Sequence, residues 1–118
     1  MALSGGGDRP LVAAVAGDVD IATAAGMSEA VIGALDQSPG RGGVVLDFTN
    51  VGFMDSTGLR AVLDISRRLD LGAASLVLLS PTRPVRKLLS LAGLDERMPI
   101  ATSIEQAENI LAQASGQP

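Results

Sequence analysis

The densest group of polar side chains in the sequence is the tetrapeptide Asp55-Ser56-Thr57-Gly58. Asp, Ser and Thr are preferred at helix N-caps, where a side-chain oxygen accepts a free backbone N–H group, and capping is the commoner role for such a cluster. The Ser56 hydroxyl can instead accept a phosphoryl group, because a helix N-terminus carries partial positive charge and free N–H donors. The sequence leaves both roles open.

Two further acids, Asp18 and Asp20, follow an apolar segment earlier in the chain. Either can cap the helix that comes next. A carboxylate that faced the Ser56 hydroxyl could also orient it, hold a metal–nucleotide complex brought by a kinase, or repel a phosphate once it is attached. Capping alone and capping combined with function remain alternatives at this point.

Hydrophobic periodicity predicts the elements that would position these residues. Apolar runs bounded by breakers predict strands at residues 11–16, 44–48, 74–79 and 98–101. Apolar residues at helical spacing predict helices that begin at Ile21, near Asp55 or Ser56, at Pro84, and after a Ser103/Gln106 capping box. Glycines at 72 and 93 are predicted to end the second and third helices, residues 1–9 form a loose tail or a short edge strand, and residues 115–118 fray.

The alternation of strands and helices predicts an α/β fold. We expect one domain over residues 1–118, with a mostly parallel sheet of four to five strands and about four helices packed against it. Parallel strands joined by helices bring their carboxyl ends to one edge of the sheet. The loops after Ala16 and Phe48 should therefore emerge together, which makes Asp20 and Ser56 candidate neighbours.

Composition narrows the possible functions of the chain. Hydrophobic residues make up 47% of the 118 residues and aromatic residues only 2%, so we expect Phe48 and Phe53 to be the large anchors of an otherwise aliphatic core. The net charge of −4, without a basic run next to aromatic residues, argues against nucleic-acid binding. No signal peptide or bilayer-spanning segment is visible, and the chain has no cysteine, so a cytoplasmic location is expected.

Enzymatic activity is not expected. The chain has neither His nor Cys, Ser56 lacks the flanking glycines of a nucleophile elbow, and no Lys follows the later strands to complete a receiver-type phosphorylation site. Neither glycine-rich segment joins a strand to the helix that follows it, so neither is predicted to bind phosphate. No metal or cofactor is expected.

The segment Val44–Phe48 followed by Phe53–Leu59 closely resembles the STAS domains of bacterial anti-sigma factor antagonists. In that family, Asp-Ser-Ser/Thr-Gly-Leu at a helix start contains the serine that a partner anti-sigma kinase phosphorylates, and here this serine is Ser56. The segment Ala16–Asp20 is similar to the family's Gly-x-x-Asp, which places its functional acid at Asp20. The resemblance extends from Leu11 to Ala114.

The resemblance implies that the unphosphorylated protein binds an anti-sigma factor, which can itself be a serine kinase, and thereby frees a sigma factor. Phosphorylation of Ser56 would end that binding. The implied partner-binding surface combines the second helix with six residues: Asp20, Met54, Asp55, Ser56, Thr57 and Gly58. The alternative is a constitutive STAS interaction subunit of a signalling complex, which phosphorylation does not control.

The N-terminus departs from the family pattern. The family has an extra strand before the one predicted at Leu11, and Ala2-Leu3-Ser4 is a poor match to it. Without that strand the sheet would have an exposed edge, which permits pairing with another chain. We therefore expect a monomer or a weak dimer.

Overall fold

The computed structural model describes residues 1–5, 9–37, 42–71 and 75–114. Within these ranges the chain forms a five-stranded sheet in the order β1-β2-β3-β4-β5. Strand β1 runs antiparallel to β2, and every other neighbouring pair is parallel. The strands are β1 (Ala2–Gly5), β2 (Leu11–Ala16), β3 (Val44–Asn50), β4 (Leu76–Leu79) and β5 (Ile100–Ala101).

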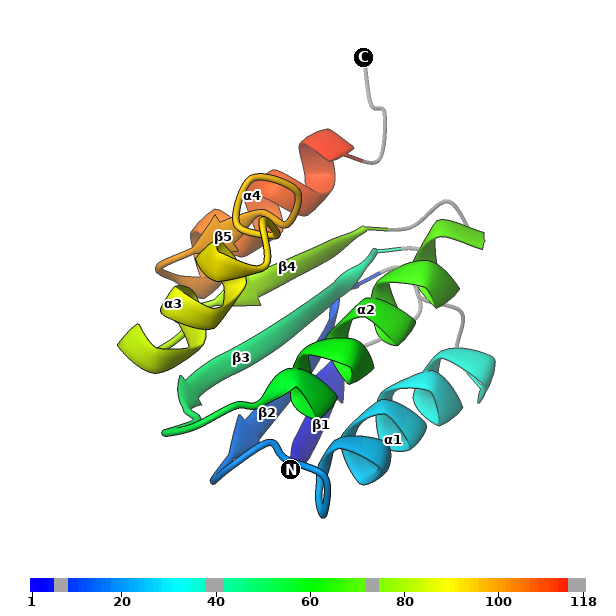
Figure 1. The fold of residues 1–118 in the computed structure, drawn as a ribbon. Helices are drawn as coiled ribbons and strands as arrows, with labels where there is room; N and C mark the ends of the chain where they lie inside the picture. Colours follow the sequence, from blue (N-terminus) through cyan, green and yellow to red (C-terminus); the bar gives the residue numbers. More distant parts are fainter. Residues whose placement is uncertain (6–8, 38–41, 72–74, 115–118) are drawn as a thin grey trace.

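Helices cover both faces of this sheet (Figure 1). Helices α1 (Ala24–Gln37), α2 (Ser56–Leu71) and α3 (Arg83–Leu91) pack on one face, and α4 (Ile104–Ala114) packs on the other against β4 and β5. The predicted α/β fold with a mostly parallel sheet and four helices is confirmed.

Strand β3 lies at the centre and is covered on both faces, as its unbroken apolar sequence predicts. Side chains alternate between the two faces of a strand, so Leu46 and Phe48 enter the larger core beneath α1, α2 and α3, while Val45 enters the smaller core beneath α4. All three are fully buried. Because β3 is packed on both faces, the position of its carboxyl end, where the next loop begins, is fixed by the core.

The N-terminal edge strand forms despite its poor match to the family pattern. Ala2 to Gly5 pair in register with Ala14 to Leu11 of β2. Of the two alternatives left open for residues 1–9, a loose tail or a short edge strand, the structure shows the edge strand, because backbone pairing needs little from the side chains of an edge strand.

Several predicted boundaries shift by a few residues. The first helix begins at Ala24 rather than Ile21, and the last strand has only Ile100 and Ala101. In the capping box, the Gln106 N–H donates to Ser103 Oγ at 3.1 Å, but the Gln106 side chain accepts from the N–H of Thr102 instead of Ser103. Gly72, Ala74 and residues 115–118 lie outside the described residues.

Candidate functional site

The loop after β2 and the loop after β3 are joined by backbone contacts at the carboxyl edge of the sheet. Val19 and Met54 form an isolated parallel bridge. The Val19 N–H donates to the carbonyl of Phe53 at 2.9 Å, and the Asp55 N–H donates to the carbonyl of Val19 at 3.2 Å. The prediction that these two loops emerge together is confirmed, and the residue that follows Val19 lies beside the start of α2.

Gly58 allows this close approach. A Cβ atom at position 58 would lie 2.5 Å from the carbonyl oxygen of Val19 and 2.8 Å from Cγ of Met54, both too close for any side chain. Gly58 is accordingly buried, in the first turn of α2. Its place in the predicted site is structural: it lets the helix start pack against the neighbouring loop and presents no surface to a partner.

Asp55 is the N-cap of α2. Its Oδ1 accepts the N–H groups of Thr57 at 2.9 Å and Gly58 at 3.1 Å, and its carbonyl accepts the N–H of Leu59 at 3.0 Å. Ser56, the first residue of the helix, is exposed, and its hydroxyl makes no hydrogen bond to any described residue. The two roles left open for the tetrapeptide therefore fall on different residues: Asp55 caps, and the Ser56 hydroxyl is free for chemistry.

Asp20 also has a capping role, in the turn that precedes α1. Its Oδ1 accepts the N–H of Ala22 at 3.0 Å, and its own N–H donates to Oγ1 of Thr23 at 3.0 Å. The Thr23 hydroxyl in turn donates to the carbonyl of Asp18 at 2.8 Å. Asp18 thus contributes its backbone rather than its carboxylate, while the half-buried Asp20 carboxylate is fixed beside the loop that contacts α2.

Two predictions about apolar residues near the site are wrong. Met54, assigned to the partner-binding surface, is only 4% exposed and packs into the larger core. Phe53, assigned to the core, is 49% exposed, and Ile21 in the neighbouring loop is 82% exposed. Side chains alternate along an extended segment, so when Met54 turns inward its neighbour Phe53 turns outward. Phe53 and Ile21 form what we call the apolar rim of the site.

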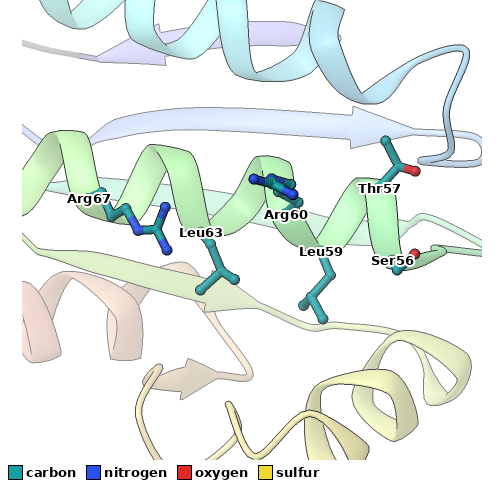
Figure 2. Close-up of a pocket in the computed structure, with 6 residues that line it drawn as sticks. All are labelled: Ser56, Thr57, Leu59, Arg60, Leu63 and Arg67. Carbon is teal, nitrogen blue, oxygen red and sulfur yellow. The ribbon is translucent and has the colours of Figure 1, made fainter.

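A hollow of about 660 Å³ begins at Ser56 and follows α2. Figure 2 shows the six side chains that line it. Two arginines, Arg60 and Arg67, line it together with Leu59 and Leu63. The structure places them on the same hollow as Ser56.

Across the described ranges, no cluster of three or more Asp and Glu side chains could hold a metal ion. The same part of the chain contains no helix that is both long and apolar enough to cross a bilayer.

Comparison with solved structures shows which proteins share this fold. The anti-sigma factor antagonist SpoIIAA in its unphosphorylated form superimposes with a TM-score of 0.79 at 27% sequence identity, over 92% of this chain and 94% of that one. The Bacillus cell fate determinant SpoIIAA in its phosphorylated form superimposes with a TM-score of 0.72 at 26% identity, over 92% and 97% of the two chains.

Two more distant structures share the fold alone. An anti-sigma factor antagonist from Mycobacterium paratuberculosis has a TM-score of 0.80 at 22% identity, over 94% of this chain and 92% of that one. A sulfate transporter family protein from Wolinella succinogenes has a TM-score of 0.73 at 16% identity, over 93% and 89%. No curated protein sequence matches the chain.

The family comparison agrees with the fold and with the motif around Ser56. The sequence profile of the STAS domain matches residues 6–107, which include every site residue described above. The chain therefore belongs to the STAS domain family.

Proposed function

We propose that this protein is an anti-sigma factor antagonist that acts in the cytoplasm by binding rather than by catalysis. With Ser56 unmodified, it binds an anti-sigma factor and releases a sigma factor. Phosphorylation of Ser56 by a serine kinase, which can be the anti-sigma factor itself, ends that binding.

The observation that carries the proposal is that Asp55 caps α2 while the hydroxyl of the next residue, Ser56, is exposed. Among the described residues, Asp55 alone supplies a side-chain cap to α2, and the exposed Ser56 hydroxyl makes no hydrogen bond, so its modification breaks none of the hydrogen bonds in that part of the chain. A phosphate there would add about −1.5 to −2 charge units and three acceptor oxygens to the surface. A partner fitted to a neutral hydroxyl would meet a bulky anion instead.

The surroundings of Ser56 suit a protein partner. Asp20 lies on the loop that is bonded to the start of α2, and the apolar rim of Ile21 and Phe53 exposes two large hydrophobic side chains at the same edge of the sheet. Large apolar side chains next to polar groups are typical of the centre of a protein interface. The likeness to SpoIIAA, an anti-sigma factor antagonist with both unphosphorylated and phosphorylated structures, supports the same assignment.

A binding experiment tests the proposal. Pull-downs from native lysate with wild-type and Ser56→Glu baits identify an anti-sigma factor that the second bait loses. The dissociation constant of the purified pair is then measured for wild type, for protein with phosphoserine at position 56, and for Ser56→Ala. We expect phosphoserine to weaken binding at least tenfold, about 1.4 kcal/mol, and Ser56→Ala to bind within about threefold of wild type.

Ser90→Asp is the matched control for added charge. Ser90 is also exposed, but it lies in the last turn of α3, a helix that starts at the carboxyl edge of the sheet and leads away from it. Its substitution should leave the affinity unchanged. Equal affinity of the phosphoserine protein and wild type would refute the switch.

A second candidate function is a constitutive STAS interaction subunit whose Ser56 is never modified. The same fold occurs in a sulfate transporter family protein, so the fold serves more than one kind of protein. This observation favours the constitutive subunit as the second candidate. Phosphate analysis of the protein isolated from its native cells, with and without stress, separates the two candidates.

A further inference from the structure

Helix α2 presents a stripe of polar and charged residues that begins at Ser56. Positions four apart on a helix lie on the same face, one turn along. Arg60 therefore follows Ser56 directly, and both line the hollow shown in Figure 2. Arg67 lines the same hollow further along the helix.

The helical rise decides which arginine can reach position 56. With about 1.5 Å per residue, Arg60 lies about 6 Å from Ser56 along the helix axis, within the span of an arginine side chain and a phosphate. Arg67 lies about 16 Å away, three turns along, and is out of reach. The two cations thus share a helix, an exposed face and a hollow but differ in their distance from the serine.

Arg60 also has no competing partner. Among the described residues, its guanidinium forms no ion pair and no hydrogen bond, whereas Nη1 of Arg67 lies 3.9 Å from Oδ1 of Asp64. Exposed arginines without partners are common. Here, however, the group is positioned one turn from a hydroxyl that the proposed function would convert to a dianion.

We infer that Arg60 binds the phosphate placed on Ser56, in an ion pair formed within α2. This inference rests on the proposed function only for the modification itself. Phosphorylation forms a bond between Ser56 Oγ and the γ-phosphorus of a nucleoside triphosphate, breaks the bond from that phosphorus to the leaving nucleoside diphosphate, and releases the hydroxyl proton. The guanidinium then donates charge-assisted hydrogen bonds to the phosphate oxygens.

The pair changes the surface in two ways at once. The phosphate adds negative charge beside Asp20 and Asp55, and Arg60 is engaged by the phosphate and neutralises part of that charge. A partner that uses Arg60 as a contact for one of its own carboxylates would lose that contact as well as meeting the phosphate. Phosphorylation would then weaken binding in two ways: the phosphate repels the partner's carboxylate, and the guanidinium of Arg60 is no longer available to that carboxylate.

The test uses the full chain with phosphoserine inserted at position 56 during translation, so that neither the kinase nor the binding partner is needed. The second pKa of the phosphoserine, ordinarily about 6, is followed by ³¹P NMR in this protein and in its Arg60→Gln and Arg67→Gln variants. We expect Arg60→Gln to raise that pKa by about 0.3 to 0.5 unit, because the nearby cation that favours the dianion is lost. Asp20 and Asp55 are unchanged in all three proteins, so their effects on the phosphoserine pKa cancel when the proteins are compared.

Arg67→Gln is the matched control, since it removes the same charge from the same hollow outside reach of the phosphate. It should move the pKa by less than about 0.1 unit, the screened effect of a distant exposed charge. An unchanged pKa in Arg60→Gln would overturn the inference, and so would an equal shift in both variants, which would indicate a diffuse field rather than a pair. A protein that never binds an anti-sigma factor could still show the pair, so failure of the proposed function remains distinguishable from failure of this inference.

Discussion

Replacing Gly58 with alanine should separate the two loops that form the site. The new Cβ would meet the Val19 carbonyl oxygen at 2.5 Å and Met54 Cγ at 2.8 Å. The first contact is with backbone, which cannot move aside by rotating a side chain. Overpacking of this kind costs about 1 to 3 kcal/mol, and the better helix propensity of alanine returns at most about 1 kcal/mol. We expect a net loss of about 1 to 2 kcal/mol in the free energy of unfolding.

Gly33→Ala provides the control for this substitution. Gly33 lies within α1, and a Cβ atom there would meet nothing within 4 Å. Alanine should therefore stabilise the protein by about 0.5 to 1 kcal/mol. The same substitution is thus expected to lower the free energy of unfolding at position 58 and to raise it at position 33, a difference of about 1.5 to 3 kcal/mol.

Urea denaturation followed by far-UV circular dichroism measures this gap, because the chain has no Trp or Tyr to report unfolding by fluorescence. At a typical slope for a domain of this size, the two midpoints should lie about 1 to 2 M apart. If Gly58→Ala unfolds at the same urea concentration as Gly33→Ala, α2 and the loop at Val19 are not in tight contact, and the two loops do not form one site.

Two further predictions concern the site residues themselves. Asp55→Ala removes the cap of α2 and should cost about 0.5 to 2 kcal/mol in the free energy of unfolding, whereas Ser56→Ala should change it by less than about 0.5 kcal/mol; equal losses in denaturation experiments would contradict the assignment of the cap. Phe53→Ser and Ile21→Ser should each weaken binding to the anti-sigma factor about tenfold or more while leaving stability within about 0.5 kcal/mol, as calorimetry and denaturation can check together. A large loss of stability in either variant would instead place that side chain in the core.

The sequence predicted the fold well because the fold depends on periodicity. Continuous apolar runs marked the strands covered on both faces, and apolar residues at helical spacing marked the helices. The meeting of the two loops at one edge of the sheet followed from parallel topology alone. The motif around Ser56 was recognisable because its residues are adjacent in the chain.

The errors arose where hydrophobicity was the only signal. Helical spacing predicts a helix that starts at Ile21, but the carboxylate of Asp20 and the hydroxyl of Thr23 hold that stretch in a turn. Composition places Phe53 in the core, and the resemblance to the STAS family places Met54 on the partner-binding surface, yet the structure reverses them, because neither signal reveals which of two adjacent apolar residues faces inward. The packing role of Gly58 depends on a loop much earlier in the chain, so no local pattern could have indicated it.

Because the cap of α2 is on Asp55 and the exposed hydroxyl is on Ser56, changes at the two positions should affect the amount of protein in the cell differently. Residue 56 can change its chemistry without altering how much of the chain is folded, so its modification should leave proteolytic turnover and copy number as they were. Damage at residue 55, by contrast, would lower the amount of protein before it changed any contact. Under the proposed function, regulation would depend on the first residue of α2 and abundance on the N-cap residue next to it.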